Sequence, residues 1–123
     1  MIDHITIQVK DLEKSKALYE EVLAVFGYKQ NLTNEKKTFY GFGLGEDPIF
    51  EIVQATPENP VSKGIHVAFK AKTKEQIDEF HKIALENGAK DNGKPGPRKN
   101  YTPTYYAAFI YDLDGNNIEA CLY

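Results

Sequence analysis

An internal repeat divides the chain into two similar halves, and few folds accommodate such a duplication. His4 and His66 occupy matching positions in two segments of alternating apolar and polar residues, 62 residues apart. Glu51 and Glu119 match in the last apolar segment of each half, 68 residues apart. The difference between the two spacings fits a longer loop in the second half. We therefore expect two copies of one small module.

The hydrophobic pattern predicts the order strand, helix, strand, strand, strand in each half. In the first half we expect strands over residues 2–9, 28–32, 38–44 and 49–54, and a helix between its N-cap Asp11 and Gly27. In the second half we expect a strand over 64–71, a helix opened by Thr73 and Gln76 as a capping box, and a terminal hairpin over 105–123. The segment 91–100 is rich in Gly, Pro and Lys, and we expect a loop there.

The length of 123 residues supports one domain with a real core, so we expect a single domain over residues 1–123. Within it, module one covers 1–55 and module two covers 63–123. The segment 56–62 between them contains two prolines and polar residues, which is typical of a linker.

Composition and charge exclude several classes of protein. The net charge of −3 leaves no basic surface for nucleic acid or for an anionic membrane, so we expect neither partner. No apolar run is long enough to cross a bilayer, and the first residues lack the features of a secretory signal. The single cysteine, Cys121, cannot form an intrachain disulfide, which favours a reducing compartment. We therefore expect a cytoplasmic protein whose partner is a small molecule.

Two histidines and two glutamates fall on the strand faces opposite the apolar residues. Alternation puts His4 and His66 on the polar face of the first strand of each half, and Glu51 and Glu119 on that of the last strand. A lone carboxylate in an apolar strand is costly to bury without a cation or hydrogen-bond donors. Each histidine alone could be an ordinary half-exposed residue. The matched set of nitrogen and oxygen donors, however, suits a divalent metal with positions left for a substrate.

The doubled pattern, with the segments YYAAF at 105–109 and DLDGNNIE at 112–119, resembles the vicinal oxygen chelate superfamily over essentially the whole chain. This superfamily contains lactoylglutathione lyase (glyoxalase), bleomycin-resistance proteins, fosfomycin-resistance enzymes and extradiol dioxygenases. The resemblance implies an α+β fold in which two βαβββ modules form a cup-shaped half-barrel sheet, mixed and antiparallel, with helices on the outer face. The cup would form within one chain or between the protomers of a homodimer.

The resemblance also implies a divalent metal (Zn, Ni, Mn, Co or Fe) held by His4, Glu51, His66 and Glu119, with Glu51 and Glu119 as the catalytic candidates that move a proton. The implied function is that of a glyoxalase-like metalloenzyme that binds its substrate through vicinal oxygens and performs proton transfer, isomerisation or lyase chemistry. One alternative is a protein that has lost the metal and sequesters a small ligand, as bleomycin-resistance proteins do. Another, ranked last, is an extradiol dioxygenase with His4, His66 and Glu119 as its iron-binding triad.

Arg98, Tyr101 and Tyr105 are the candidate substrate-binding residues. Arg98 is the only arginine, in a proline-stiffened segment that the implied fold places near the mouth of the cup. There it could fork onto a carboxylate or phosphate of a ligand, or it could be a solvated loop charge. We expect Cys121 to be a buried, inert thiol. His81 lies off the apolar stripe of its helix, so we expect it to be exposed.

Overall fold

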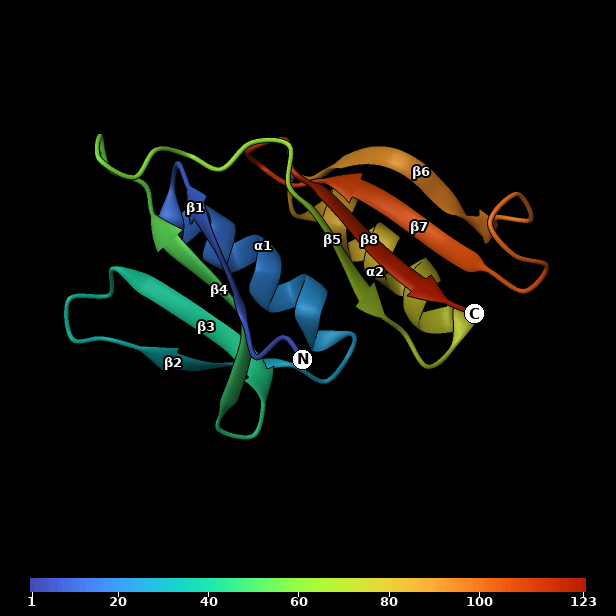
Figure 1. Ribbon diagram of the computed structural model, residues 1–123, viewed down its shortest axis with the longest axis horizontal. Coiled ribbons are helices and arrows are strands. Elements are labelled where there is room, and N and C mark those ends of the chain that lie inside the picture. The colour runs from blue at the N-terminus through green and yellow to red at the C-terminus, as the bar shows by residue number, and fades with distance from the viewer. The chain divides into compact units, whose positions relative to one another are not determined.

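The computed structural model describes residues 1–123 and divides the chain into two compact units, Met1–Lys63 and Gly64–Tyr123. Each unit holds one helix and four strands (Figure 1). The structure therefore confirms the α+β class and the two βαβββ modules.

In the first unit, a helix lies against one face of a four-stranded sheet (Figure 1). Its elements are β1 (Ile5–Val9), α1 (Leu12–Ala24), β2 (Lys29–Thr33), β3 (Phe39–Leu44) and β4 (Asp47–Gln54). The strand order is β1-β4-β3-β2. Strand β1 runs parallel to β4, and the other neighbours are antiparallel, so β2, β3 and β4 form an antiparallel meander.

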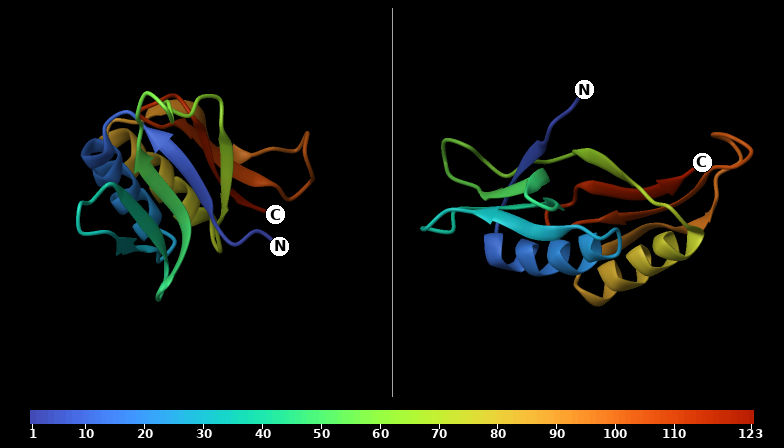
Figure 2. Two further views of the ribbon diagram at one scale, coloured as in Figure 1. Left: turned by 60° about the vertical axis from the view of Figure 1, so that its left-hand side comes forward. Right: turned by 90° about the horizontal axis from the view of Figure 1, so that it is seen from below.

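The second unit has the same topology. Its elements are β5 (His66–Lys70), α2 (Lys74–Glu86), β6 (Lys90–Pro97), β7 (Tyr106–Tyr111) and β8 (Asn117–Leu122). The strand order is β5-β8-β7-β6, with β5 parallel to β8 and the remaining pairs antiparallel. Figure 2 shows α2 lying along one face of this sheet, as α1 does on the sheet of its own unit.

Helix α1 begins and ends where its sequence requires. The Asp11 side chain accepts a hydrogen bond from the backbone N–H of Lys14, which satisfies one of the free donors of the first turn. Leu18 and Leu23 are fully buried on the side that faces the sheet. Gly27 follows the helix with φ +83°, a left-handed conformation that glycine adopts without strain.

Helix α2 starts with the predicted capping box. The Thr73 side chain accepts from the backbone N–H of Gln76, and the Gln76 side chain accepts in return from the backbone N–H of Thr73. Three residues of its apolar stripe, Ile77, Phe80 and Ala84, are fully buried. Neither α1 nor α2 has the length and apolar character that a membrane-spanning helix requires.

The strand register reproduces the sequence repeat. In the first unit Thr6 lies opposite Glu51 across the parallel β1–β4 pair. In the second unit Ala68 lies opposite Glu119 across the parallel β5–β8 pair. Since Ala68 and Glu119 are the residues that the repeat aligns with Thr6 and Glu51, the two modules share one register as well as one topology.

Strand β6 corrects the expectation of a loop over residues 91–100. Residues Lys90–Pro97 pair with β7 at the edge of the sheet, where β6 has a neighbour on one side only. Proline lacks an N–H and is tolerated on edge strands and at bulges. The pairing shifts register around Gly93 and Gly96, so the strand is irregular where the sequence is rich in glycine and proline.

The expectation that His81 is exposed was wrong. Its side chain is buried, and its Nε2 atom lies 2.9 Å from Oδ1 of Asp91. Asp91 belongs to β6, the strand that the sequence did not predict. Because α2 packs against this strand, the helix side that carries His81 is covered.

The turn between β7 and β8 is held by two buried side chains. Oδ1 of Asp112 accepts from the backbone N–H groups of Asp114 and Asn116. The side-chain oxygen of Asn116, which is fully buried, accepts from the backbone N–H of Ile65 just before β5. The turn therefore fixes the start of β8 against the start of β5, and with it the positions of the side chains on these strands.

Candidate functional site

The first unit brings His4 and Glu51 together. The His4 Nε2 atom lies 3.8 Å from Oε1 of Glu51, and the two side chains are 48% and 15% exposed. The hydroxyl of Thr6 donates to the same Oε1 atom over 2.8 Å. On the other side of the ring, His4 Nδ1 lies 2.7 Å from Oδ1 of Asp3. This hydrogen bond, and then the charge of Glu51, raise the pKa of His4.

The second unit brings His66 and Glu119 together at closer range. The His66 Nε2 atom lies 2.9 Å from Oε2 of Glu119, and the hydroxyl of Tyr105 donates to Oε1 over 2.6 Å. The side chain of Glu119 is only 6% exposed, whereas that of His66 is 49% exposed. Both oxygens of this buried carboxylate are therefore occupied by donors from its own unit.

Tyr105 connects this carboxylate to an aromatic cluster. Its ring stacks in parallel on Tyr123 and meets the ring of Tyr101 edge-on, with centroids 5.5 and 5.3 Å away. Burial raises the pKa of the Tyr105 hydroxyl, and its hydrogen bond to Glu119 raises it further. Cys121 is buried on the same sheet face, and its burial raises the pKa of its thiol. The prediction that Cys121 is buried is confirmed, and a protonated thiol is a poor nucleophile.

A pocket of about 440 Å³ lies beside His66 within the second unit. Arg98 and Tyr101, two of the predicted substrate-binding residues, line it. The Arg98 guanidinium donates to the backbone carbonyls of Lys94 and Gly96 over 2.7 and 3.0 Å and lies 5.4 Å from the ring centroid of Phe109. The positive charge at this pocket is therefore held in place by backbone carbonyls of β6.

The donor chemistry of the two pairs fits a divalent metal. Imidazole nitrogen and carboxylate oxygen are common ligands of such ions, and in both pairs the His Nε2 atom is the one beside the carboxylate. Within neither unit do three or more His, Cys, Asp or Glu side chains form a group that could hold an ion. Each unit by itself therefore supplies two such donors, one imidazole nitrogen and one carboxylate oxygen.

The structure groups the predicted residues into one pair and one larger cluster. His4 and Glu51 form the pair. Glu119 contacts His66 and Tyr105, and the pocket beside His66 is lined by Arg98 and Tyr101.

Sequence reasoning missed Thr6, Asn92 and Asn117 at these positions. Asn92 lies in β6, which was expected to be a loop, so the sequence pattern did not assign its side chain to a face of the sheet. Asn117 was recognisable in principle: the repeat aligns it with Ile49, and it is one of the places where the two halves differ in chemistry.

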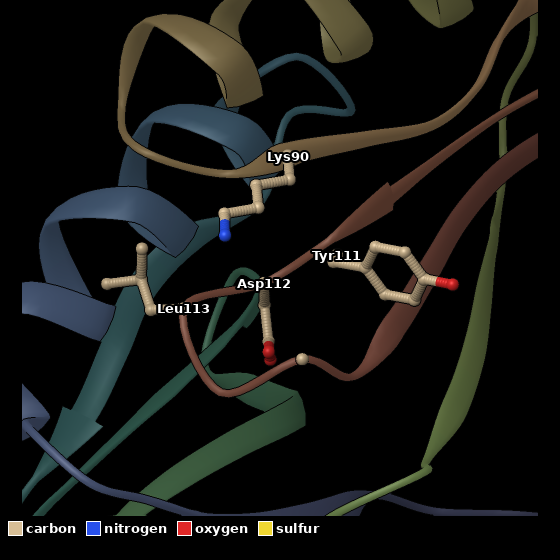
Figure 3. A pocket seen from close by; sticks show the side chains of 5 residues that line it. Lys90, Tyr111, Asp112 and Leu113 are labelled. Carbon is tan, nitrogen blue, oxygen red and sulfur yellow. The ribbon is translucent and has the colours of Figure 1, made fainter.

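A smaller pocket of about 320 Å³ lies at the turn between β7 and β8 (Figure 3). Lys90, Tyr111, Asp112 and Leu113 line it, and none of the predicted site residues does. The Asp112 carboxylate is already engaged by the backbone of the turn. This pocket is therefore a feature of the turn that positions β8.

Comparison with known proteins gives a consistent result. A family model described as the Glyoxalase/Bleomycin resistance protein/Dioxygenase superfamily matches residues 1–120. A crystal structure of a glyoxalase/bleomycin resistance protein from Albidiferax ferrireducens T118 is 30% identical, with 98% of each chain covered and a TM-score of 0.85. A search of curated proteins found no significant match.

Two more distant structures share the fold. Lactoylglutathione lyase from Agrobacterium tumefaciens is 19% identical over 98% of this chain and 92% of its own, with a TM-score of 0.68. A glyoxalase/bleomycin resistance protein/dioxygenase family enzyme from Burkholderia phytofirmans PsJN is 19% identical over 97% and 95%, with a TM-score of 0.71.

Proposed function

Because the chain belongs to the glyoxalase/bleomycin resistance protein/dioxygenase superfamily, we propose that it is a small-molecule metalloenzyme with glyoxalase-like chemistry. In this proposal His4, Glu51, His66 and Glu119 hold one divalent metal, and the substrate binds through two neighbouring oxygens. The observation that supports it best is that each unit places one imidazole Nε2 beside one carboxylate at the same strand register.

The mixed nitrogen and oxygen donors suit Zn, Ni, Mn, Co or Fe. Such a metal, when bound, polarises the oxygens of a substrate and lowers the cost of removing a neighbouring proton. The protein residues must then orient the substrate and accept that proton.

Glu51 is the better placed of the two glutamates to carry a proton. Only its Oε1 atom has a partner, the Thr6 hydroxyl, and no hydrogen bond engages Oε2. Both oxygens of Glu119 accept hydrogen bonds, from His66 and Tyr105. We therefore assign proton transfer to Glu51. Glu119 would bind the metal and take no part in proton transfer.

The pocket beside His66 favours a small anionic substrate. Arg98 supplies a fixed positive charge, and its three hydrogen bonds to backbone carbonyls use at most three of its five N–H groups. The remaining donors suit a carboxylate or phosphonate oxygen. Tyr101, more than half exposed, and the amides of Asn92 and Asn117 supply further polar contacts. The volume of about 440 Å³ suits a small metabolite.

We propose that the two pairs meet around one ion either within a chain or across a homodimer. The free, buried Cys121 agrees with a reducing compartment such as the cytoplasm. The molar mass of the metal-loaded protein distinguishes a site within one chain from a site across a homodimer.

A metal-free binding protein is the second candidate, and one observation favours it. Glu119 already satisfies both of its oxygens with donors from its own unit, so this buried carboxylate is stable without a cation. Such a protein would sequester an anionic ligand in the pocket beside His66 without transforming it.

Thermal melting separates the two candidates. Protein purified without chelator is melted with and without divalent metals, and then with a panel of short carboxylates and phosphonates. The enzyme predicts that a metal raises the melting temperature and that the ligand-induced rise disappears with chelator. The binding protein predicts a ligand-induced rise that chelator leaves unchanged. Arg98→Gln should reduce the ligand effect in either case, whereas Lys99→Gln, an exposed neighbour in the same loop, should not.

A further inference from the structure

The two candidate metal-binding histidines differ in the partner of their Nδ1 atom. His4 Nδ1 lies 2.7 Å from Oδ1 of Asp3. His66 Nδ1 lies 3.2 Å from the side-chain amide nitrogen of Asn117. A carboxylate can only accept a hydrogen bond, whereas an amide can donate or accept according to which way it is turned. Nδ1 of His4 can therefore only donate to its partner, whereas Nδ1 of His66 can either donate or accept.

The hydrogen bonds around His66 determine its tautomer. Glu119 accepts at Nε2 over 2.9 Å, so this nitrogen carries the proton of the neutral ring. Nδ1 then has the lone pair and accepts from the Asn117 amide N–H. The oxygen of the same amide accepts from the side-chain amide of Asn92 over 3.2 Å, which favours this orientation of Asn117.

His4 is held in the opposite tautomer. Asp3 accepts at Nδ1, so the neutral ring carries its proton there and directs the Nε2 lone pair towards Glu51. The Nε2 to Oε1 distance of 3.8 Å is longer than a hydrogen bond, as expected for two acceptors. His4 can thus offer Nε2 to a cation without rearrangement, but His66 cannot.

We propose that Asn117 is a positioning residue that sets the tautomer of His66 and thereby controls whether its Nε2 atom can bind a metal. The part of this inference that concerns metal binding rests on the proposed function. The part that concerns the tautomer of metal-free His66 does not. For Nε2 to be free to bind a metal, its proton would have to leave to solvent while Nδ1 takes one up. The amides of Asn117 and Asn92 would then both turn over, so that the Asn117 oxygen accepts from Nδ1–H and its nitrogen donates to the side-chain oxygen of Asn92.

This turn also changes the pocket beside His66. Asn92 and Asn117 both line that pocket together with Arg98. Reversing the two amides exchanges donors for acceptors in its wall, so ligand preference should depend on whether metal is bound. The first unit has no such device, because Ile49 occupies the position that the repeat aligns with Asn117.

The test uses the tautomer itself. Long-range ¹H–¹⁵N NMR of the imidazole rings, recorded for the wild type and the variants at the same pH, reports which nitrogen carries the proton. Metal-free wild type should show His66 protonated at Nε2 and His4 at Nδ1. Asn117→Asp offers only acceptors, so Nδ1 of His66 should carry a proton without any metal, whereas in the wild type it carries none. Asn117→Leu, which removes the polar partner, should leave the proton at Nε2, held by Glu119.

Zinc titration supplies the second readout. Asn117→Asp should bind Zn²⁺ about ten- to a hundredfold more tightly than wild type, because a preset partner at Nδ1 raises ligand basicity. Asn100→Asp adds the same charge at an exposed position, and we expect it to leave both readouts unchanged. A metal-free His66 with its proton on Nδ1, or an Asn117→Asp protein with an unchanged tautomer, would overturn the inference. Failure of every variant to bind Zn²⁺, with the tautomer shift intact, would refute only the proposed metal function and the metal-driven turn.

Discussion

Glu51 and Glu119 occupy the same register position in two parallel strand pairs, but the hydroxyl that donates to each comes from a different position in its unit. The residue opposite Glu51 is Thr6, which donates to it across β1 and β4. The residue opposite Glu119 is Ala68, which has no donor, and Tyr105 donates instead from the segment before β7. The duplicated module has kept the carboxylate and changed the group that holds it.

Removing the Tyr105 hydroxyl should destabilise the protein. In Tyr105→Phe, Oε1 of the buried Glu119 loses its donor, and an unsatisfied buried acceptor costs about 1–3 kcal/mol. The matched change Tyr101→Phe removes a hydroxyl from an exposed ring that makes no hydrogen bond within the protein, and should change stability by less than about 0.5 kcal/mol. Urea unfolding of both variants measures the difference, and equal midpoints would contradict the role given to Tyr105.

A methyl group at residue 93 should disturb ligand binding at the pocket beside His66. A Cβ on Gly93 would lie 2.9 Å from Cδ1 of Phe109 and 3.2 Å from Nη2 of Arg98, and its φ of +152° disfavours other residues. Gly93→Ala should therefore shift the guanidinium and weaken anion binding by about tenfold or more, as expected for loss of a charge-assisted hydrogen bond.

Gly96→Ala is the matched control, since its nearest neighbour, Nη1 of Arg98, lies at an ordinary contact distance of 3.5 Å. Calorimetric titration with the anion that stabilises the wild type most provides the measurement. If both alanine variants bound that anion as the wild type does, Arg98 would not be part of the binding site.

Three tyrosines should resist ionisation at high pH. Hydrogen bonds to Glu13 and Asp78 raise the pKa of Tyr40 and Tyr106, and burial with the bond to Glu119 raises that of Tyr105. Since each folded-state pKa lies above the unfolded value near 10, the stabilisation is complete below about pH 10 and is lost as the pH rises through the folded-state values. Ultraviolet titration should show two classes among the eight tyrosines, and a single class near pH 10 would contradict these contacts.

The contact between His81 and Asp91 should govern part of the acid stability. The hydrogen bond to His81, with another from the backbone N–H of Gly93, lowers the pKa of Asp91. A lowered folded-state pKa gives stability that is present above the ordinary value near 4 and disappears as the pH falls through the folded-state pKa. Asp91→Asn should be less stable than wild type at neutral pH and equally stable in strong acid. Asp47→Asn, at an exposed position, should show no such convergence in acid unfolding curves.

Much of the fold could be predicted because its signals are local. Alternation identified the strands that bury one face, and the caps at Asp11 and Thr73 located both helices. The structure adds a shared register, since Glu51 and Glu119, which the repeat aligns, lie at the same step of a parallel strand pair. Strand β6 escaped prediction because an edge strand tolerates missing N–H donors and needs no apolar face. Its glycines and prolines therefore predicted a loop.

The sequence singled out the charged residues of the candidate site but not the residues that contact them. His66 and Glu119 were visible as exceptions to an apolar pattern, and Arg98 as the only arginine. The partners Asn92 and Asn117 are ordinary polar residues whose importance arises from strand pairing across β6, β7 and β8. Burial of His81 could not be foreseen for the same reason, since its partner Asp91 lies on the unpredicted strand.

The central claim, that one divalent metal binds through both His–Glu pairs, is tested most directly by metal content after equilibrium dialysis against Zn²⁺. We predict about one ion per chain for the wild type and for His81→Gln, which alters the histidine outside both pairs. We predict loss of the ion in both His4→Gln and His66→Gln. A wild type that retains no metal, or an ion retained equally when either His4 or His66 is replaced, would contradict the account.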